Sequence, residues 1–111
     1  MEKLLEYLQR GLEQYQNGAF EAAYQLYSRA IHLVEDHGGD EQMEAAQIAE
    51  LYAMRASSLV AQDQQAALED QDIFNQALDD YDTALELNPH SSLYLNLRGE
   101  MYLSSQIEVQ R

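Results

Sequence analysis

Apolar residues recur along this chain at steps of three and four positions, the period of an α-helix that is buried on one side. The recurrence is clearest in the segments 20–34 and 74–87. Such steps place the apolar residues of a segment on one face of a helix. Extended to the rest of the chain, the pattern predicts five helices and no sheet. The expected ranges are Glu2–Gln16, Ala19–Val34, Glu41–Gln62, Gln65–Leu87 and Ser92–Ser105.

Two of these predicted helices carry the same residue types at the same spacing. An aromatic residue, an alanine, a tyrosine and a second alanine follow one another at steps of three, four and three. The positions are Phe20, Ala23, Tyr27 and Ala30 in the first helix and Phe74, Ala77, Tyr81 and Ala84 in the second. Small alanines between large residues let a neighbouring helix approach closely. The chain therefore contains an internal repeat.

This repeat resembles the tetratricopeptide repeat, a helix–turn–helix unit of about 34 residues. The segment LELNP at 85–89 is close to the family's repeat ending, whereas the first repeat has Glu35 at the place of the proline. Each preceding helix carries a large residue, an arginine three positions later and a small residue next to it. These triplets are Tyr7, Arg10 and Gly11; Tyr52, Arg55 and Ala56; and Leu95, Arg98 and Gly99. They resemble the Arg-Gly variant of the family, over about nine-tenths of the chain.

The resemblance implies an all-α fold, an α-solenoid of antiparallel helix pairs in a right-handed superhelix. Residues 1–111 then form one domain, with repeat one at about 4–37, repeat two at about 45–91 and a partial third repeat at about 92–111. The spacings from Gly11 to Ala56 and from Ala56 to Gly99 are 45 and 43 positions, longer than the repeat of about 34. The extra residues fall in a loop at 35–41 and in an insertion near 63–71. The insertion favours helix, and we expect it to lengthen the second helix of repeat two; a longer first helix is the alternative.

Composition supports an all-α fold and limits the classes of molecule that the chain could bind. Leucine, alanine and glutamine, all good helix formers, number 16, 14 and 13. The 20 acidic and six basic residues give a net charge of −14. A surface this negative repels nucleic acid and anionic lipid, and we expect neither as a partner. The same charge attracts basic protein segments. The chain has no cysteine, and we recognise no signal peptide or membrane span, so we expect a cytoplasmic protein.

The repeated arginine position points between helices in this family, so a buried guanidinium there requires a carboxylate. Asp80, next to Tyr81, is predicted to form a structural ion pair with Arg55 or Arg98. Arg10 lacks this partner because repeat one has Leu26 at the equivalent position. The alternative is that an arginine of the set holds the carboxylate of a ligand.

The resemblance also implies a concave groove, lined by the first helix of each repeat. The family's groove positions fall on Leu5, Leu8, Leu12 and Tyr15 in repeat one, on Glu50, Ala53, Ser57 and Val60 in repeat two, and on Leu93, Asn96, Glu100 and Leu103 in repeat three. The basic clamp with which one branch of the family grips chaperone tails is absent from these positions. The three leucines of repeat one fit a groove or a core equally well, because the phase of that helix is ambiguous.

Catalytic chemistry is not evident. The chain has no phosphate loop, dinucleotide fingerprint or oriented nucleophile, so we expect no enzyme activity and no cofactor. His37 lies among carboxylates at 36–41 but matches no metal-site spacing, so no metal is expected. The predicted function is a protein-interaction adaptor that binds a peptide or partner helix with a basic amphipathic segment. The alternatives are a self-assembling module, with a weak homodimer through the C-terminal end, and an interaction domain of a longer repeat protein or regulator.

Overall fold

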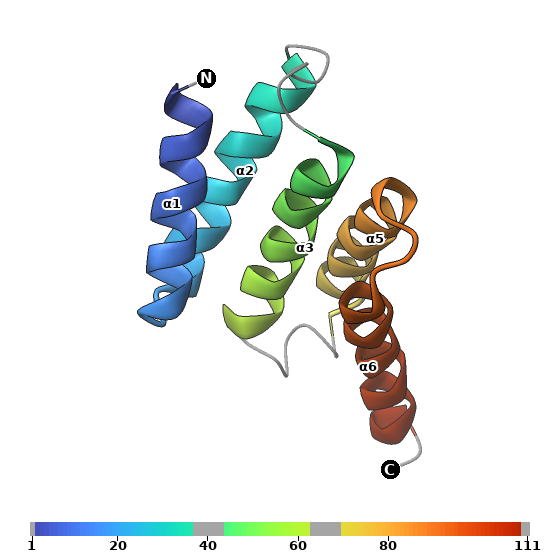
Figure 1. Cartoon of the computed structure of the whole chain (residues 1–111). Coiled ribbons are helices and arrows are strands. Elements are labelled where there is room, and N and C mark those ends of the chain that lie inside the picture. Colours follow the sequence, from blue (N-terminus) through green and yellow to red (C-terminus); the bar gives the residue numbers. More distant parts are fainter. Residues whose placement is uncertain (1, 37–43, 63–69, 110–111) are drawn as a thin grey trace.

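The structure is a computed structural model that describes the backbone of residues 2–36, 44–62 and 70–109, and side chains from 6 to 103 within these ranges. All regular structure in the described residues is α-helical, as the sequence predicts. The helices are α1 (Glu2–Gln16), α2 (Phe20–Asp36), α3 (Ala45–Gln62), α5 (Gln71–Leu87) and α6 (Ser92–Val109). Figure 1 shows that the chain reverses direction from each helix to the next.

The turn between α1 and α2 is formed by Asn17 and Gly18. Gly18 has a φ of +82°, in the left-handed region that favours glycine. The amide of Ala19 donates to the carbonyl of Gln14 at 2.8 Å, and the amide of Gly18 donates to that of Tyr15 at 3.1 Å. These two bonds form a Schellman motif, which satisfies the last carbonyls of α1 and directs the chain back along it.

Helix α5 starts later than the sequence pattern predicts. Asp70 is extended, with φ −87° and ψ 111°, and its carboxylate accepts from the backbone amides of Asp72 and Ile73. An aspartate in this position caps a new helix because it satisfies amides that have no partner within the helix. The prediction of one continuous helix Gln65–Leu87 is therefore wrong at Asp70. The rest of the insertion, residues 63–69, lies outside the described residues.

The helices pack in chain order: α1 on α2, α2 on α3, α3 on α5 and α5 on α6. The buried residues form two clusters. The first, between α2 and α3, consists of Ala23, Tyr27, Ala30, Ile31, Val34 and Leu51. The second, between α3, α5 and α6, consists of Ala49, Ala53, Ala56, Phe74, Ala77, Leu78, Tyr81, Ala84, Leu85, Tyr94 and Met101. Tyr52, half-buried on α3, packs against both.

Candidate binding surface on α1, α3 and α6

The residues expected to line a groove lie on α1, α3 and α6, which run in the same direction in Figure 1. Among those whose side chains are described, Leu12, Glu50, Leu93, Asn96, Glu100 and Leu103 are exposed, and Leu8, Tyr15, Ser57 and Val60 are half-buried. Leu5 lies outside the described side chains. Ala53 is only 3% exposed and belongs to the second core cluster, so its assignment to the binding surface is wrong. Its methyl group instead fills the contact of α3 with its neighbours.

The leucines of α1 divide between core and surface. Leu8 packs against the first core cluster, whereas Leu12 remains 46% exposed. Tyr15 also packs against that cluster, and its ring meets Phe20 edge-on with 5.1 Å between centroids. One turn of α1 thus anchors the helix through Leu8, and the next presents Leu12 to solvent.

Two buried tyrosines bring their hydroxyl ends toward the first helix of their own repeat. A Cβ added at Gly11 would lie 3.0 Å from Cζ of Tyr27, the ring carbon that carries the hydroxyl. The absence of a side chain at Gly11 is therefore what admits this ring. In the next repeat, the hydroxyls of Tyr81 and Ser57 are hydrogen-bonded at 3.0 Å. The spacing alone predicts only a packing role for both tyrosines. The sequence does contain a signal of this second role. Both repeats have tyrosine where phenylalanine would fill the same space, and a tyrosine hydroxyl needs a polar partner.

The charges of Glu50 and Glu100 act on these phenols. Burial, and then the charge of Glu50, raises the pKa of Tyr27 to about 12. The same two causes raise the pKa of Tyr94. The pKa of Tyr81 is raised chiefly by burial, with Glu100 among the smaller causes. The tyrosines themselves are buried, so the exposed carboxylates of Glu50 and Glu100 are what this surface offers, and a carboxylate is the group that accepts an ammonium or guanidinium group.

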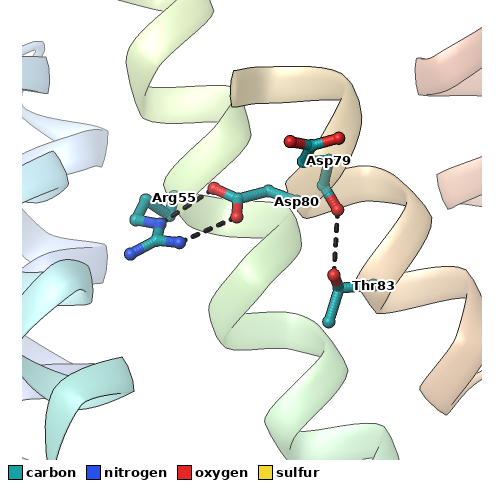
Figure 2. A network of polar contacts seen from close by, with 4 residues as sticks. All are labelled: Arg55, Asp79, Asp80 and Thr83. Carbon is teal, nitrogen blue, oxygen red and sulfur yellow. Dashed lines mark hydrogen bonds and ion pairs between the residues drawn. The ribbon is translucent and has the colours of Figure 1, made fainter. Parts of the chain in front are cut away.

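Asp80 pairs with only one of the two arginines that the sequence offers. Nε and Nη2 of Arg55 donate to Oδ2 and Oδ1 of Asp80, each at 2.8 Å (Figure 2). This hydrogen bonding is the main cause that raises the pKa of Arg55. The guanidinium also lies 5.7 Å from the ring centroid of Tyr52. Arg55 is thus held by contacts inside the fold, which argues against a role in binding a ligand carboxylate.

Arg98 has a different partner from the predicted one. Its Nη1 donates to Oδ1 of Asp82 at 2.7 Å, and not to Asp80. Positions two apart on a helix point to different sides, so Asp80 meets α3 while Asp82 meets α6. Arg10 lies 3.8 Å from Glu6 on α1, and both side chains are more than half exposed.

Comparison with protein-family models, curated proteins and solved structures finds no match. The likeness to the tetratricopeptide repeat therefore rests on the residues and spacings quoted above.

Two further properties concern other kinds of site. Among the described residues, no three histidine or acidic side chains come together in an arrangement that would hold a metal ion. His37 and the rest of the segment 37–43 lie outside the described residues. None of the helices, as far as they are described, is both long enough and apolar enough to cross a bilayer.

Proposed function

We propose that this chain is a tetratricopeptide-type solenoid domain that acts as a protein-interaction adaptor. The repeated spacings, the packing of helices in chain order and the seating of Tyr27 on Gly11 support the solenoid. The surface on α1, α3 and α6 would then be the concave one, where such domains bind a peptide or a partner helix. In this proposal the chain has no catalytic role and binds its partner without a cofactor.

The observation that carries the proposal is the distribution of exposed groups on this surface. Leu12 presents apolar area on α1, while Glu50 and Glu100 present exposed carboxylates on α3 and α6. A complementary segment has an apolar stripe followed by Lys or Arg, as an amphipathic basic helix does. Attraction between solvated charges acts mainly on the association rate and weakens as salt is added.

The electrostatic part is tested with a fluorescent synthetic helix that has leucines on one face and lysines beside them. We expect Glu50→Gln together with Glu100→Gln to weaken binding several-fold, with most of the loss in the association rate. The control is Glu21→Gln with Glu86→Gln, which removes the same charge from exposed positions on α2 and α5. Equal weakening by both pairs would mean that net charge alone attracts the peptide, and would overturn the site.

The apolar part is tested at Leu12. Leu12→Ser is expected to weaken the same peptide while the helical circular dichroism and the melting temperature stay unchanged, because the side chain is 46% exposed. Leu8→Ser is expected to lower the melting temperature, because Leu8 packs against the core. A peptide that binds Leu12→Ser with wild-type affinity contradicts the proposal. An acidic C-terminal tail peptide is expected not to bind, since Glu50 and Glu100 repel its carboxylates.

A further inference from the structure

An open pocket of about 330 Å³ lies between α1 and α2. Its lining consists of Arg10 and Gln14 from α1 and of Ala22, Gln25, Leu26 and Arg29 from α2. Arg10 and Gln14 are four positions apart and share one side of α1, whereas Leu12, two positions from each, points to another side. The pocket is therefore separate from the α1, α3 and α6 surface.

This pocket gathers positive charge in an acidic chain. Two of the six basic residues line it, and none of its lining residues is acidic. The side chain of Arg10 is 56% exposed and lies 3.8 Å from Glu6, which is too far for a hydrogen bond and too exposed for a strong ion pair. Arg29 is exposed, and no ion pair joins it to an acidic side chain that the structure describes. Both guanidinium groups are thus available to a ligand.

The second repeat shows how a carboxylate occupies the equivalent place. Arg10 of repeat one corresponds to Arg55 of repeat two, and Leu26 corresponds to Asp80. Asp80 accepts hydrogen bonds from Nε and Nη2 of Arg55, each at 2.8 Å. Leu26 has no acceptor in its side chain, so repeat one keeps the arginine and lacks the carboxylate.

Two further positions differ between the repeats in the same direction. Gln25 of repeat one corresponds to Asp79 of repeat two, and Arg29 corresponds to Thr83. Among these four pairs of positions, repeat two has one arginine and two carboxylates, whereas repeat one has two arginines and no carboxylate. The excess of charge is therefore reversed from negative to positive between two copies of the same unit.

We propose that this pocket binds a single aspartate or glutamate side chain of a partner protein, between the guanidinium groups of Arg10 and Arg29. A carboxylate is the acceptor that an arginine binds with two hydrogen bonds, as Arg55 does within the chain. The rest of the partner segment should be neutral or basic, because a chain of charge −14 repels a segment that is acidic throughout. At physiological salt, charges more than about 8 Å away are largely screened, so remote carboxylates oppose binding only weakly.

A side chain on a helix fits the pocket better than a free small acid. In repeat two the carboxylate comes from a helix that packs beside the helix of the arginine. A partner helix also covers Ala22, an exposed apolar residue of the lining, whereas a free acid would leave its methyl group in water.

The test is nuclear magnetic resonance of the isotope-labelled chain, in which each arginine has its own Nε–Hε signal. The probe is an end-capped helical peptide with one central glutamate and no other charge, and the control peptide has glutamine in its place. Such a probe is not attracted to the carboxylates of the α1, α3 and α6 surface. We expect the glutamate peptide to shift the signals of Arg10 and Arg29 saturably, and to leave those of Arg55 and Arg98 in place.

Variants of the pocket separate recognition from net charge. Arg10→Gln and Arg29→Gln should each weaken binding of the glutamate peptide by about tenfold, because each removes charge-assisted donors. Gln25→Glu keeps both arginines, and its own carboxylate should compete with the peptide and weaken it as well. The matched controls are Arg98→Gln on α6 and Gln76→Glu at an exposed position of α5, which make the same changes of charge and should leave the affinity unchanged. Circular dichroism verifies that each variant keeps its helices.

Three results overturn this proposal. If neither arginine signal shifts, or if the glutamine peptide shifts them equally, the pocket does not recognise a carboxylate. Equal weakening by the pocket variants and their controls would mean that net charge alone decides the affinity. If sodium acetate binds as tightly as the glutamate peptide, the pocket is a site for an adventitious ion only. Each of these results leaves the proposed function untouched, because the pocket shares no residue with the α1, α3 and α6 surface.

Discussion

Arg55 holds Asp80 by both of its carboxylate oxygens, with two N–O distances of 2.8 Å between α3 and α5. The side chains are 21% and 10% exposed, so the pair lies mostly within the helix interface. A bidentate contact of this kind fixes direction as well as distance. It therefore sets how α5 is rotated and shifted along α3, and with it the placement of Tyr81 beside Ser57.

We expect Asp80→Ala to lower the free energy of unfolding by about 1–3 kcal/mol, because the mutation leaves a partly buried guanidinium without its acceptor. The matched control is Asp79→Ala, one position away on α5. Its carboxylate is exposed and turned away from Arg55 in Figure 2, and Thr83 bonds only its backbone carbonyl. Urea denaturation followed by circular dichroism measures both variants. Equal stability of the Asp80→Ala and Asp79→Ala variants would mean that the ion pair between Arg55 and Asp80 does not stabilise the fold.

The ion pair of Arg98 and Asp82 is expected to contribute less. Its side chains are 35% and 47% exposed, so water and salt screen the attraction. Asp82→Ala should therefore lower the free energy of unfolding by less than about 1 kcal/mol, and the loss should vanish at high salt. A double-mutant cycle with Arg98→Ala isolates the pair. A coupling as large as that between Arg55 and Asp80 would contradict this ranking.

Alanine at Gly11 and at Gly99 should have effects of opposite sign on the stability of the monomer. At Gly11 the new methyl group would lie 3.0 Å from the Tyr27 ring, which is buried and has little room to move. We expect Gly11→Ala to destabilise by about 1 kcal/mol or more through overpacking. At Gly99 the space is open, so Gly99→Ala should stabilise by up to about 1 kcal/mol through helix propensity. Thermal melts at micromolar concentration compare them, and a stabilising Gly11→Ala would show that the ring can move aside.

Stability should fall at alkaline pH because Tyr27 resists ionisation in the folded chain. Its pKa is raised from 10.0 to about 12, so the unfolded chain loses this proton first as pH rises. The contribution is complete below about pH 10 and is lost between about pH 10 and 12, about 3 kcal/mol in total at about 1.36 kcal/mol per pKa unit. Tyr27→Phe keeps the ring on Gly11 and should flatten the pH dependence. It should not abolish it, because burial also raises the pKa of Tyr52, Tyr81 and Tyr94. An unchanged slope in Tyr27→Phe would contradict this assignment.

Loss of the Asp70 cap should destabilise α5. Asp70→Ala removes the acceptor of two backbone amides, which typically lowers stability by about 1 kcal/mol. Asp70→Asn keeps an acceptor and should recover most of the loss. Asp72→Asn, which removes a charge from the first turn of the same helix, is the control for the helix dipole. If Asp70→Ala and Asp72→Asn lower the melting point equally, charge rather than capping explains the effect.

The helices could be predicted because they follow from local periodicity, which needs no knowledge of their neighbours. The start of α5 was also within reach of the sequence. Asp70, three positions before the apolar residue Ile73, is an N-terminal capping signal. High helix propensity in the preceding residues favours the opposite prediction, and the capping hydrogen bonds outweigh it.

The partners of the arginines were less predictable. From the sequence alone, either Asp80 or Asp82 could pair with Arg98. Only the position of α5 between α3 and α6 decides which carboxylate faces which helix. The exposure of Leu12 against the half-burial of Leu8 has a similar origin. It depends on how α1 is rotated against α2, which the Gly11 and Tyr27 contact sets across 16 positions of sequence. Such contacts are products of tertiary packing, not of local pattern.

The buried residues form two clusters joined at Tyr52, in a row of helices that touch mainly their neighbours along the chain. In such a row, cooperativity passes from one helix to the next, and the terminal helices can open while the middle stays closed. The amide protons of α3 should then exchange last, and those of α1 and α6 first. A partner laid across all three would tie both fraying ends to the protected centre. Binding of such a partner would therefore be detected less as a change of shape than as slower amide hydrogen exchange in α1 and α6.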